Sequence, residues 1–369
     1  MTDQKIKEFA EILVERSAKV EEGDNVYLLA KSLESMPLFE EVRKQIIKKG
    51  GRPHEHLLYD SQLSSEGMDY DWIKHAPKSQ LKKMSEAKMK EMKEMDAYIR
   101  IGGGDNTQEL SGLNPEKISA HKQATEDILT ERLKKKWVAT RYPTDSLAQA
   151  AGMPTEEFRD FLLEAVTEVD WRQLEEKNEK IKEKFDDSKK VRIKDDNTDL
   201  TLSLEKREGV CDNGDNNIPC GEVFYAPRKE SLEGKIKFTY PGVQNGTEVE
   251  GIELKFENGR IVDYSAESNE EFLEKMIESD EGSHYIGELG IGTNQHIDRY
   301  VKSTLFDEKI GGTIHLAIGR AYEECVENEK ERNQSSIHWD IVKDLRKEKG
   351  GGKIIVDGET VQKNGEWQI

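Results

Sequence analysis

The stretch from Tyr285 to Asp340 constrains the fold of this chain most, because it places ionisable side chains inside short apolar runs. In order it reads Y-I-G-E-L-G-I-G-T-N, then G-G-T-I-H-L-A-I-G-R-A-Y, then S-S-I-H-W-D. Such runs are typical of strands or buried helices, where a carboxylate or imidazole is costly unless it is paired or binds a cation. Each of these residues alone is most simply a hydrogen-bonded core residue. Gathered in one region, they indicate a common site.

The chain is long enough for two domains, since single hydrophobic cores seldom grow beyond about 250 to 300 residues. Its first part alternates helical and strand-like patterns. Strands are expected at 26–30, 56–59, 97–101 and 137–140, and helices at 5–20, 37–49, 119–135 and 155–186. This order predicts an open, mostly parallel α/β sheet in an N-terminal domain of residues 1–186.

The second half of the last helical run, residues 174–190, is dense in Glu and Lys and reads as a solvated connecting helix. After it the pattern changes to short strands. Asn258-Gly259, Asp357-Gly358 and Asn364-Gly365 are hairpin signals between such strands. We therefore expect residues 187–369 to form an α+β, largely antiparallel C-terminal domain that carries the metal-competent residues.

Three consecutive glycines, Gly102 to Gly104, follow the strand-like run 97–101. They match neither of the common phosphate-binding patterns, and no lysine is placed to meet a phosphate. A tight turn is the simpler interpretation.

The candidate ligands begin with Glu222, at the entry of the apolar run V-F-Y-A. Glu288 lies between Gly287 and Gly290, where a backbone or a ligand can approach closely. His315 and Tyr322 are seven positions apart, which on a helix places both on one face.

His338 and Asp340 flank Trp339, and in an extended segment this spacing points both to one side. Glu222, Glu288, His315, His338 and Asp340 offer more ligands than one tetrahedral zinc requires, which suits two bridged divalent ions, Zn, Co or Mn. Two such ions activate a bridging hydroxide and polarise a carbonyl, so the expected chemistry is hydrolysis.

Composition excludes several classes of partner. The 75 acidic and 56 basic residues give a formal charge of −19, which disfavours nucleic acid. No run is apolar enough to span a membrane, and the N-terminus lacks the apolar core of a signal peptide. Cys211, Cys220 and Cys325 are too few for a disulfide framework. A cytoplasmic protein is expected.

The segments I-P-C-G-E-V-F-Y-A-P, Y-I-G-E-L-G-I-G, G-T-I-H-L-A-I-G-R-A-Y and S-S-I-H-W-D together resemble the M29 family of metallo-aminopeptidases, the group of aminopeptidases T and S. The resemblance implies an α/β N-terminal domain, a metal-binding C-terminal domain, a peptide substrate and a homodimer. It also implies that Glu222, Glu288, His315, His338 and Asp340 are metal ligands.

Under the same resemblance, Glu288 is the candidate proton acceptor and Tyr322 the candidate donor to the oxyanion. The sequence departs from familiar bacterial members in G-E-L-G-I-G-T-N at Glu288 and in D-E-K-I-G-G before His315, which bears on the shape of the substrate pocket and hence on side-chain preference.

Two other functions remain open at this point. His315, His338 and Asp340 alone form a two-histidine, one-carboxylate set, as in a non-haem iron ring-cleaving dioxygenase on a related scaffold. A non-catalytic relative that only binds peptide or metal is the third reading. Retention of both Glu222 and Glu288 favours the two-metal peptidase.

Overall fold

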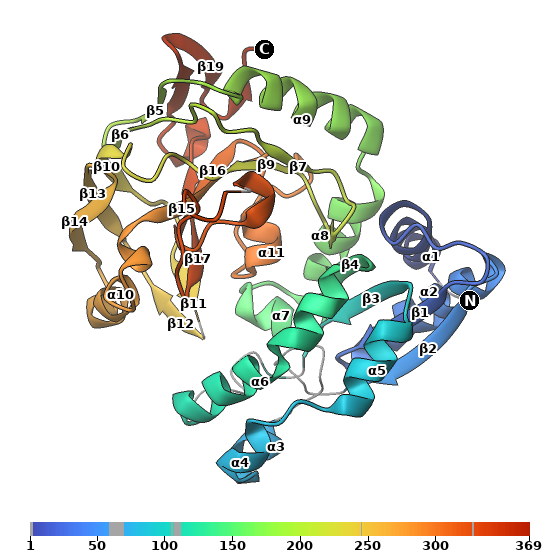
Figure 1. The fold of residues 1–369 in the computed structure, drawn as a ribbon. Helices are drawn as coiled ribbons and strands as arrows, with labels where there is room; N and C mark the ends of the chain where they lie inside the picture. The colour runs from blue at the N-terminus through green and yellow to red at the C-terminus, as the bar shows by residue number, and fades with distance from the viewer. Residues whose placement is uncertain (1–2, 59–69, 105, 107–111, 245, 327) are drawn as a thin grey trace. The chain divides into compact units, whose positions relative to one another are not determined.

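A computed structural model describes residues 3–58, 70–104, 106, 112–244, 246–326 and 328–369. The chain forms two compact units (Figure 1). The first unit contains residues 1–168 and 214–219, and the second contains residues 169–213 and 220–369. Each unit is described here by itself.

The first unit is built on a parallel five-stranded sheet of order β2-β1-β3-β4-β8. Its strands are β1 (Asn25–Ala30), β2 (Arg52–Leu57), β3 (Ala97–Gly102), β4 (Lys136–Arg141) and β8 (Asn217–Ile218). The predicted α/β class is confirmed. Strand β2 begins four residues before the run expected at 56–59, so His54 and His56 lie within it.

Helices cover both faces of this sheet (Figure 1). The helices of this unit are α1 (Gln4–Glu11), which continues as a π-helix to Ser17, α2 (Met36–Lys48), α3 (Tyr70–His75), α4 (Lys78–Leu81), α5 (Glu86–Glu94), α6 (Pro115–Leu133), α7 (Asp145–Ala150) and α8 (Thr155–Thr167). Of these, α3 and α4 pack against α6. On one face Tyr27 and Tyr98 pack with Met92 of α5 and Ile128 of α6. Side chains two positions apart in a strand point to the same face, so each face of the sheet packs against its own helices.

The second unit contains two antiparallel sheets and a short ribbon. The larger sheet has the order β14-β13-β10-β6-β5-β18-β19-β20: β5 (Val191–Lys194), β6 (Asp199–Leu202), β10 (Glu233–Lys237), β13 (Glu253–Glu257), β14 (Arg260–Ser265), β18 (Lys353–Val356), β19 (Glu359–Lys363) and β20 (Glu366–Trp367). The ribbon pairs β11 (Gly242–Gln244) with β12 (Thr247–Val249).

The smaller sheet has the order β17-β16-β15-β9-β7: β7 (Val210–Asp212), β9 (Glu222–Tyr225), β15 (Ile286–Gly292), β16 (Thr313–Gly319) and β17 (His338–Asp344). Helices α9 (Trp171–Phe185), α10 (Glu270–Ile277) and α11 (Thr304–Asp307) complete the unit. The largely antiparallel character expected of the C-terminal region is confirmed.

The three hairpin signals join the strands as predicted. Asn258, Asp357 and Asn364 have positive φ, as do the glycines that follow them. Two successive residues with positive φ form the turn that matches the twist of an antiparallel pair. The turns connect β13 to β14, β18 to β19 and β19 to β20.

Helix α9 belongs to the second unit, whereas the sequence placed the domain boundary after it. Only one of its faces is solvated, because Leu174, Ile181 and Phe185 are buried and the last two join the core of the second unit. The return of residues 214–219 to the first unit is carried by β8, a strand of two residues.

The two faces of the smaller sheet have different roles. One face, which includes Leu289, Ile291, Leu316 and Ile341, packs into the hydrophobic core of the second unit. All seven residues of β15 and all seven of β16 are buried. Ionisable side chains on the other face are therefore held inside the protein as well.

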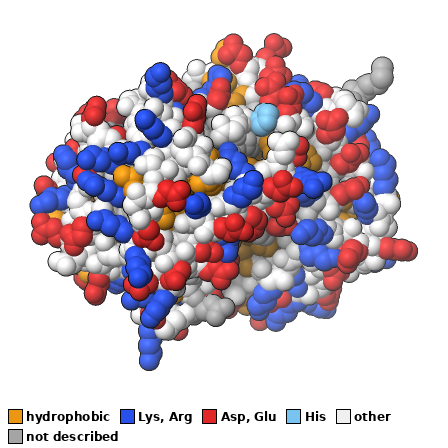
Figure 2. Space-filling model, turned by 90° about the horizontal axis from the view of Figure 1, so that it is seen from above, with side chains coloured by type: hydrophobic (Ala, Val, Ile, Leu, Met, Phe, Trp, Pro, Cys, Tyr) orange, Lys and Arg blue, Asp and Glu red, His pale blue; other side chains and the backbone are white. Residues whose placement is uncertain are grey.

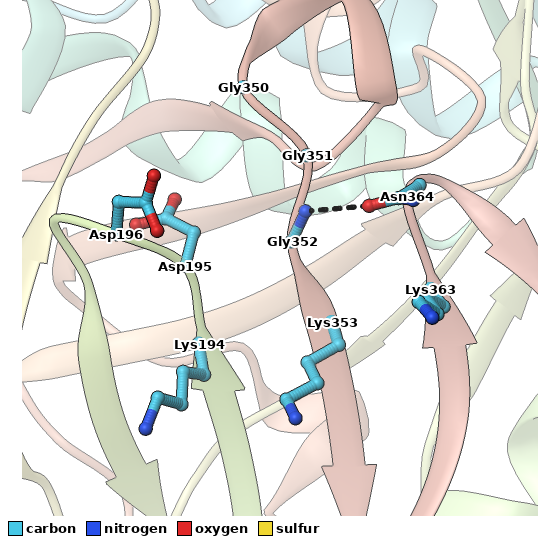
Figure 3. Close-up of a pocket in the computed structure, with 9 residues that line it drawn as sticks. All are labelled: Lys194, Asp195, Asp196, Gly350, Gly351, Gly352, Lys353, Lys363 and Asn364. Carbon is cyan, nitrogen blue, oxygen red and sulfur yellow. Dashed lines mark hydrogen bonds between the residues drawn. The ribbon is translucent and has the colours of Figure 1, made fainter.

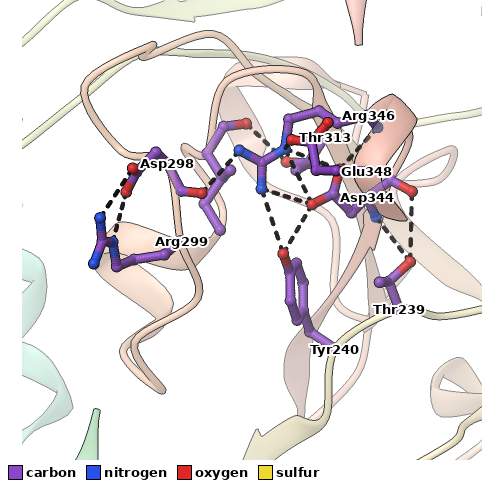
Figure 4. Close-up of polar contacts among 9 residues, drawn as sticks. Thr239, Tyr240, Asp298, Arg299, Thr313, Asp344, Arg346 and Glu348 are labelled. Carbon is purple, nitrogen blue, oxygen red and sulfur yellow. Dashed lines mark hydrogen bonds and ion pairs between the residues drawn. The ribbon is translucent and has the colours of Figure 1, made fainter. Parts of the chain in front are cut away.

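A polar network anchors the far end of β17 (Figure 4). Asp344 is fully buried and accepts hydrogen bonds from Arg346 Nη2 at 2.7 Å and from the Tyr240 hydroxyl at 2.8 Å. Arg346 Nη1 also donates to the Asp298 carbonyl at 2.8 Å. Charge-assisted bonds of this kind fix the register of the strand that carries His338 and Asp340.

The face of the molecule in Figure 2 carries acidic and basic side chains interspersed, with little hydrophobic surface between them. Within the described ranges, no helix has the length and apolar character needed to cross a bilayer.

Candidate metal centre

The smaller sheet of the second unit brings the predicted ligands to one face. In the antiparallel register Gly292 pairs with Glu222, Gly290 with His315, and Ala317 with both Glu288 and Asp340. Paired residues in adjacent strands point to the same side. The five ligands predicted from sequence therefore come from four adjacent strands.

His315 lies at the middle of this group. Its Nε2 atom is 3.0 Å from Glu288 Oε1, 3.8 Å from Glu222 Oε2 and 4.0 Å from Asp340 Oδ1. His338 Nε2 lies 3.3 Å from Asp340 Oδ1. The observed geometry brings all five together.

Both imidazoles are oriented by the backbone. The Nδ1 atom of His315 donates to the Glu308 carbonyl at 3.2 Å, and that of His338 donates to the Arg320 carbonyl at 2.7 Å. A carbonyl only accepts, so each Nδ1 carries a proton. Each Nε2 is therefore the atom presented to the centre, which is the usual arrangement around a metal-ligating histidine.

The helix expected from His315 to Tyr322 is wrong. His315 lies in β16, which ends at Gly319, and Tyr322 is an extended residue that directly precedes a short 3-10 helix, Glu323–Cys325. Tyr322 nevertheless reaches the site, because its ring packs against that of His338 with centroids 4.5 Å apart. Burial and the nearby Glu288 and Asp340 raise the pKa of Tyr322, so its hydroxyl remains protonated and able to donate.

Three further charged residues, Asp212, Glu308 and Lys309, belong to the site and were not predicted. Lys309 is fully buried, forms a short ion pair with Glu308, and places its Nζ 3.1 Å from Glu222 Oε1 and 3.8 Å from Asp212 Oδ2. The D-E-K sequence before His315 was a partial signal, since two acids and a lysine stand there next to an apolar run.

The pKa values of the ionisable groups show how charge is balanced in the centre when no metal is bound. Burial raises the pKa values of Glu222, Glu288 and Glu308. Burial disfavours the charged imidazoles, but the adjacent carboxylates outweigh it and raise the pKa of His315 to about 9 and that of His338 to about 10. Without a metal, protons and the Lys309 ammonium therefore balance the negative charge.

The residues fit divalent cations. Two sets of side chains have ligand atoms within 4.8 Å of one another, namely Glu222 with Glu308 and His315, and Glu288 with His315 and Asp340. Glu222 Oε2 and Glu288 Oε2 are buried and accept no hydrogen bond from the residues that the structure describes. Buried carboxylate oxygens without donors are costly unless a cation meets them.

A small pocket adjoins the centre. It is bordered by Glu308 and Asp340, and its other walls include Pro241, Val243, Tyr300 and Val342. Lys302, Thr304 and Asp307 complete its lining, so the pocket has both apolar and charged walls.

The fold and the site define a carboxylate-rich metal centre of the kind found in metal-dependent hydrolases. Residues 2–367 match the thermophilic metalloprotease family, M29, and the chain belongs to that family. It is therefore a metallo-aminopeptidase by class, a hydrolase of peptide bonds.

Its relatives carry matching names. The chain is 25% identical to aminopeptidase 2 of Geobacillus stearothermophilus, over 97% of this chain and 94% of that one. It is 26% identical to aminopeptidase T of Thermus thermophilus, over 91% of each. The solved structure of wild-type AmpT from Thermus thermophilus matches 99% of each chain with a TM-score of 0.78 at 22% identity.

A 2,5-dihydroxypyridine dioxygenase from Pseudomonas putida KT2440 also shares the fold, with a TM-score of 0.58 and 15% identity over 100% of this chain and 97% of that one. At this identity the likeness concerns the fold alone.

Proposed function

We propose that the enzyme holds two divalent cations, Zn, Co or Mn, and removes N-terminal residues from short peptides. The observation that carries this proposal is the charge of the centre. Asp212, Glu222, Glu288, Glu308 and Asp340 supply five carboxylates, and Lys309 supplies one ammonium. Two divalent cations offset the four remaining negative charges without added protons, whereas one cation leaves two charges that only protonation of a buried group could balance.

The ligands divide between two positions. Glu222, Glu308 and His315 would hold one cation, and Glu288, His338 and Asp340 the other, with His315 and Glu288 close enough to serve either. When bound, the pair of cations would generate a nucleophilic hydroxide near neutral pH and polarise the scissile carbonyl.

Glu288 is the proposed proton acceptor. Burial raises its pKa, which brings a carboxylate closer to the range that suits a general base, and its Oε2 accepts no hydrogen bond from described residues. Tyr322 is the proposed donor to the tetrahedral oxyanion, because it stands against His338 with a protonated hydroxyl.

Val243 and Val342 border the small pocket beside Asp340. We propose that this apolar wall contacts the side chain of the residue that is removed.

A panel of aminoacyl amides and short peptides, with free and with acetylated N-termini, tests the proposal. The metal-loaded enzyme should cleave only the free forms, and Glu288→Gln should lower kcat by at least about a hundredfold while metal content is kept. Glu278→Gln, an exposed glutamate of the same unit, is the matched control. Failure of the loaded enzyme to cleave any member of the panel would sink the peptidase assignment.

The same preparation separates the alternatives. One iron per chain together with oxygen consumption would instead support the dioxygenase reading, in which Glu222, Glu288 and Glu308 have no ligand role. If Glu288→Gln changes no measured activity, a non-catalytic relative is the better account.

We also propose that the enzyme acts in the cytoplasm as a homodimer, as its family resemblance implies. Light scattering coupled to size-exclusion chromatography tests the dimer, and the mass of a single chain at micromolar concentration would contradict it.

A further inference from the structure

Asn333 is a buried residue outside the ligand set that lies where three segments of the second unit meet. It is 4% exposed and stands between β16 and β17. Its Nδ2 atom donates to the Gly319 carbonyl, at the end of β16, at 2.6 Å and to the Gly282 carbonyl, before β15, at 2.8 Å. Carbonyl oxygens only accept, so the group that faces them must be the NH2 of the side chain. Asn333 therefore contributes two donated hydrogen bonds.

The backbone of Asn333 holds the same region. Its carbonyl accepts from the Ala321 N–H at 3.0 Å, and the Arg320 N–H donates to the Ile337 carbonyl at 2.8 Å. Two successive peptide groups, the one before Arg320 and the one after it, are therefore each hydrogen-bonded at both ends. Asn333 supplies one partner to each of them.

The second of these peptide groups orients a predicted metal ligand. Its carbonyl, that of Arg320, accepts from His338 Nδ1 at 2.7 Å, and its N–H is the one that donates to Asn333. A peptide group is planar, so a hydrogen bond at the N–H end restricts the direction of the carbonyl at the other end. Contacts of this kind set the ring orientation of metal-ligating histidines. Asn333 thus acts on His338 through one rigid group.

Tyr322 depends on the same support. It directly follows Ala321, whose N–H is held by Asn333, and its ring packs against those of His338 and Phe224 with centroids 4.5 and 6.3 Å apart. A shift of the Ala321 backbone would therefore move the Tyr322 side chain away from His338. One metal ligand and the proposed oxyanion donor share a single anchor.

Close backbone packing fixes the place of Asn333 on both sides. A β-carbon on Gly282 would lie 1.7 Å from the Gln334 carbonyl oxygen. Gly319 has φ of +103°, and a β-carbon there would lie 2.4 Å from the Ile337 carbonyl oxygen. The segment 333–337 can approach these two strands only because glycines stand at both positions.

Asn364 provides a contrast in the same unit. In the pocket of Figure 3, its Oδ1 atom accepts from the Gly352 N–H at 3.4 Å. An aspartate at that position can still accept, so Asn364→Asp keeps the contact. The described lining of this pocket, which includes Lys194 and Lys353, contains none of the five predicted ligands.

We propose that Asn333 is a positioning residue of the metal centre, which holds the peptide groups on both sides of Arg320 and through them orients His338 and Tyr322. It touches neither cation nor substrate. The inference rests on the proposed function, since it requires that the centre binds divalent cations. Asn333 lies in the polar run E-R-N-Q-S-S, which gives no sign of such a role.

Asn333→Asp tests the proposal, because it keeps the size of the side chain and removes the NH2 donor. Isothermal titration with Zn²⁺ after chelation should show at least about a tenfold loss of affinity for one of the two cations. The visible absorption spectrum of the Co²⁺-loaded variant should change, because it depends on ligand geometry. On a cleaved peptide, kcat should fall by at least about tenfold while KM changes less than about twofold. Asn364→Asp should match the wild type in all three measurements.

A second variant separates positioning from folding. Asn333→Ser introduces no buried carboxylate, and its hydroxyl can donate to only one of the two carbonyls. It should fold, as read by urea denaturation, and should show the same loss of Zn²⁺ affinity and the same spectral change. A folded variant with lowered stability but wild-type Zn²⁺ affinity and Co²⁺ spectrum would overturn the positioning role. A wild type that binds no divalent cation would contradict the proposed function itself, and this inference with it.

Discussion

The imidazole of His315 lies over the backbone of Gly290 on the neighbouring strand. A β-carbon at position 290 would be 1.9 Å from the Cε1 atom of the ring and 2.1 Å from Nε2. The two residues are paired in the register of β15 and β16. His315 therefore reaches Glu288 and Glu222 only because position 290 has no side chain.

Gly290→Ala should consequently displace the ring. We expect a loss of at least about tenfold in the affinity for divalent cations. Loss of the groups that orient a metal ligand has an effect of this size, and a displaced His315 ring is likewise no longer correctly oriented. Isothermal titration with Zn²⁺ after chelation measures this. Gly350→Ala is the matched control, since φ at Gly350 is +103° but nothing lies within 4 Å of an added β-carbon. It should cost stability without changing metal affinity, and equal metal affinity in both variants would contradict the close-packing account.

Lys309 should contribute strongly to the folding stability of the metal-free protein. Lys309→Met removes the ammonium that meets Glu222, Glu308 and Asp212, and leaves buried carboxylates with less compensation. Loss of one partner from a buried ionic group typically costs about 3 to 5 kcal/mol of unfolding free energy. Urea denaturation with a chelator present measures it, and added Zn²⁺ should restore part of the loss.

Lys302→Met provides the comparison for that experiment. Lys302 pairs with Glu248 at 2.7 Å, but both side chains are substantially exposed. An exposed pair is worth no more than about 1 kcal/mol. If both lysine variants lose the same stability, the buried position of Lys309 has no special role.

His121 should make the enzyme sensitive to mild acid. It is 1% exposed, neither ring nitrogen has a partner in the described part of the chain, and burial lowers its pKa from the ordinary value of 6.5. Because the pKa of His121 is lower in the folded state, burial of the neutral imidazole contributes its full stability above the unfolded-state pKa. That contribution is lost as the pH falls through the folded-state pKa. Wild-type stability should therefore decline from about pH 7 downward more steeply than that of His121→Leu. Urea midpoints across this range measure the difference, and exposed His75→Leu should follow the wild type.

Some elements were predictable because the chemistry that fixes them is local. Asn-Gly and Asp-Gly pairs favour positive φ for local reasons, and Asn258-Gly259 and Asp357-Gly358 adopt it, so their hairpins could be predicted. Strand β16 was mistaken for a helix for the opposite reason. Both of its faces are buried, and an apolar run without alternation does not distinguish a buried strand from a buried helix.

The site shows the same division. Histidines and acids in apolar runs indicated five ligands, but Lys309 in a charged tripeptide resembled a surface residue. Its role depends on Glu222, 87 positions away, and that contact exists only once β9 and the segment before β16 are brought together. Asp212 likewise enters the site through the pairing of β7 with β9.

Metal content is the most direct test of the central claim that these carboxylates and imidazoles hold two cations. Elemental analysis of the wild-type enzyme saturated with Zn²⁺ and freed of unbound metal should give two ions per chain. Glu308→Gln should retain one ion. Glu308 is chosen for this substitution because it belongs to only one of the two ligand groups, whereas His315 belongs to both. A saturated wild type with a single ion per chain, or Glu308→Gln with the full wild-type content, would contradict the account.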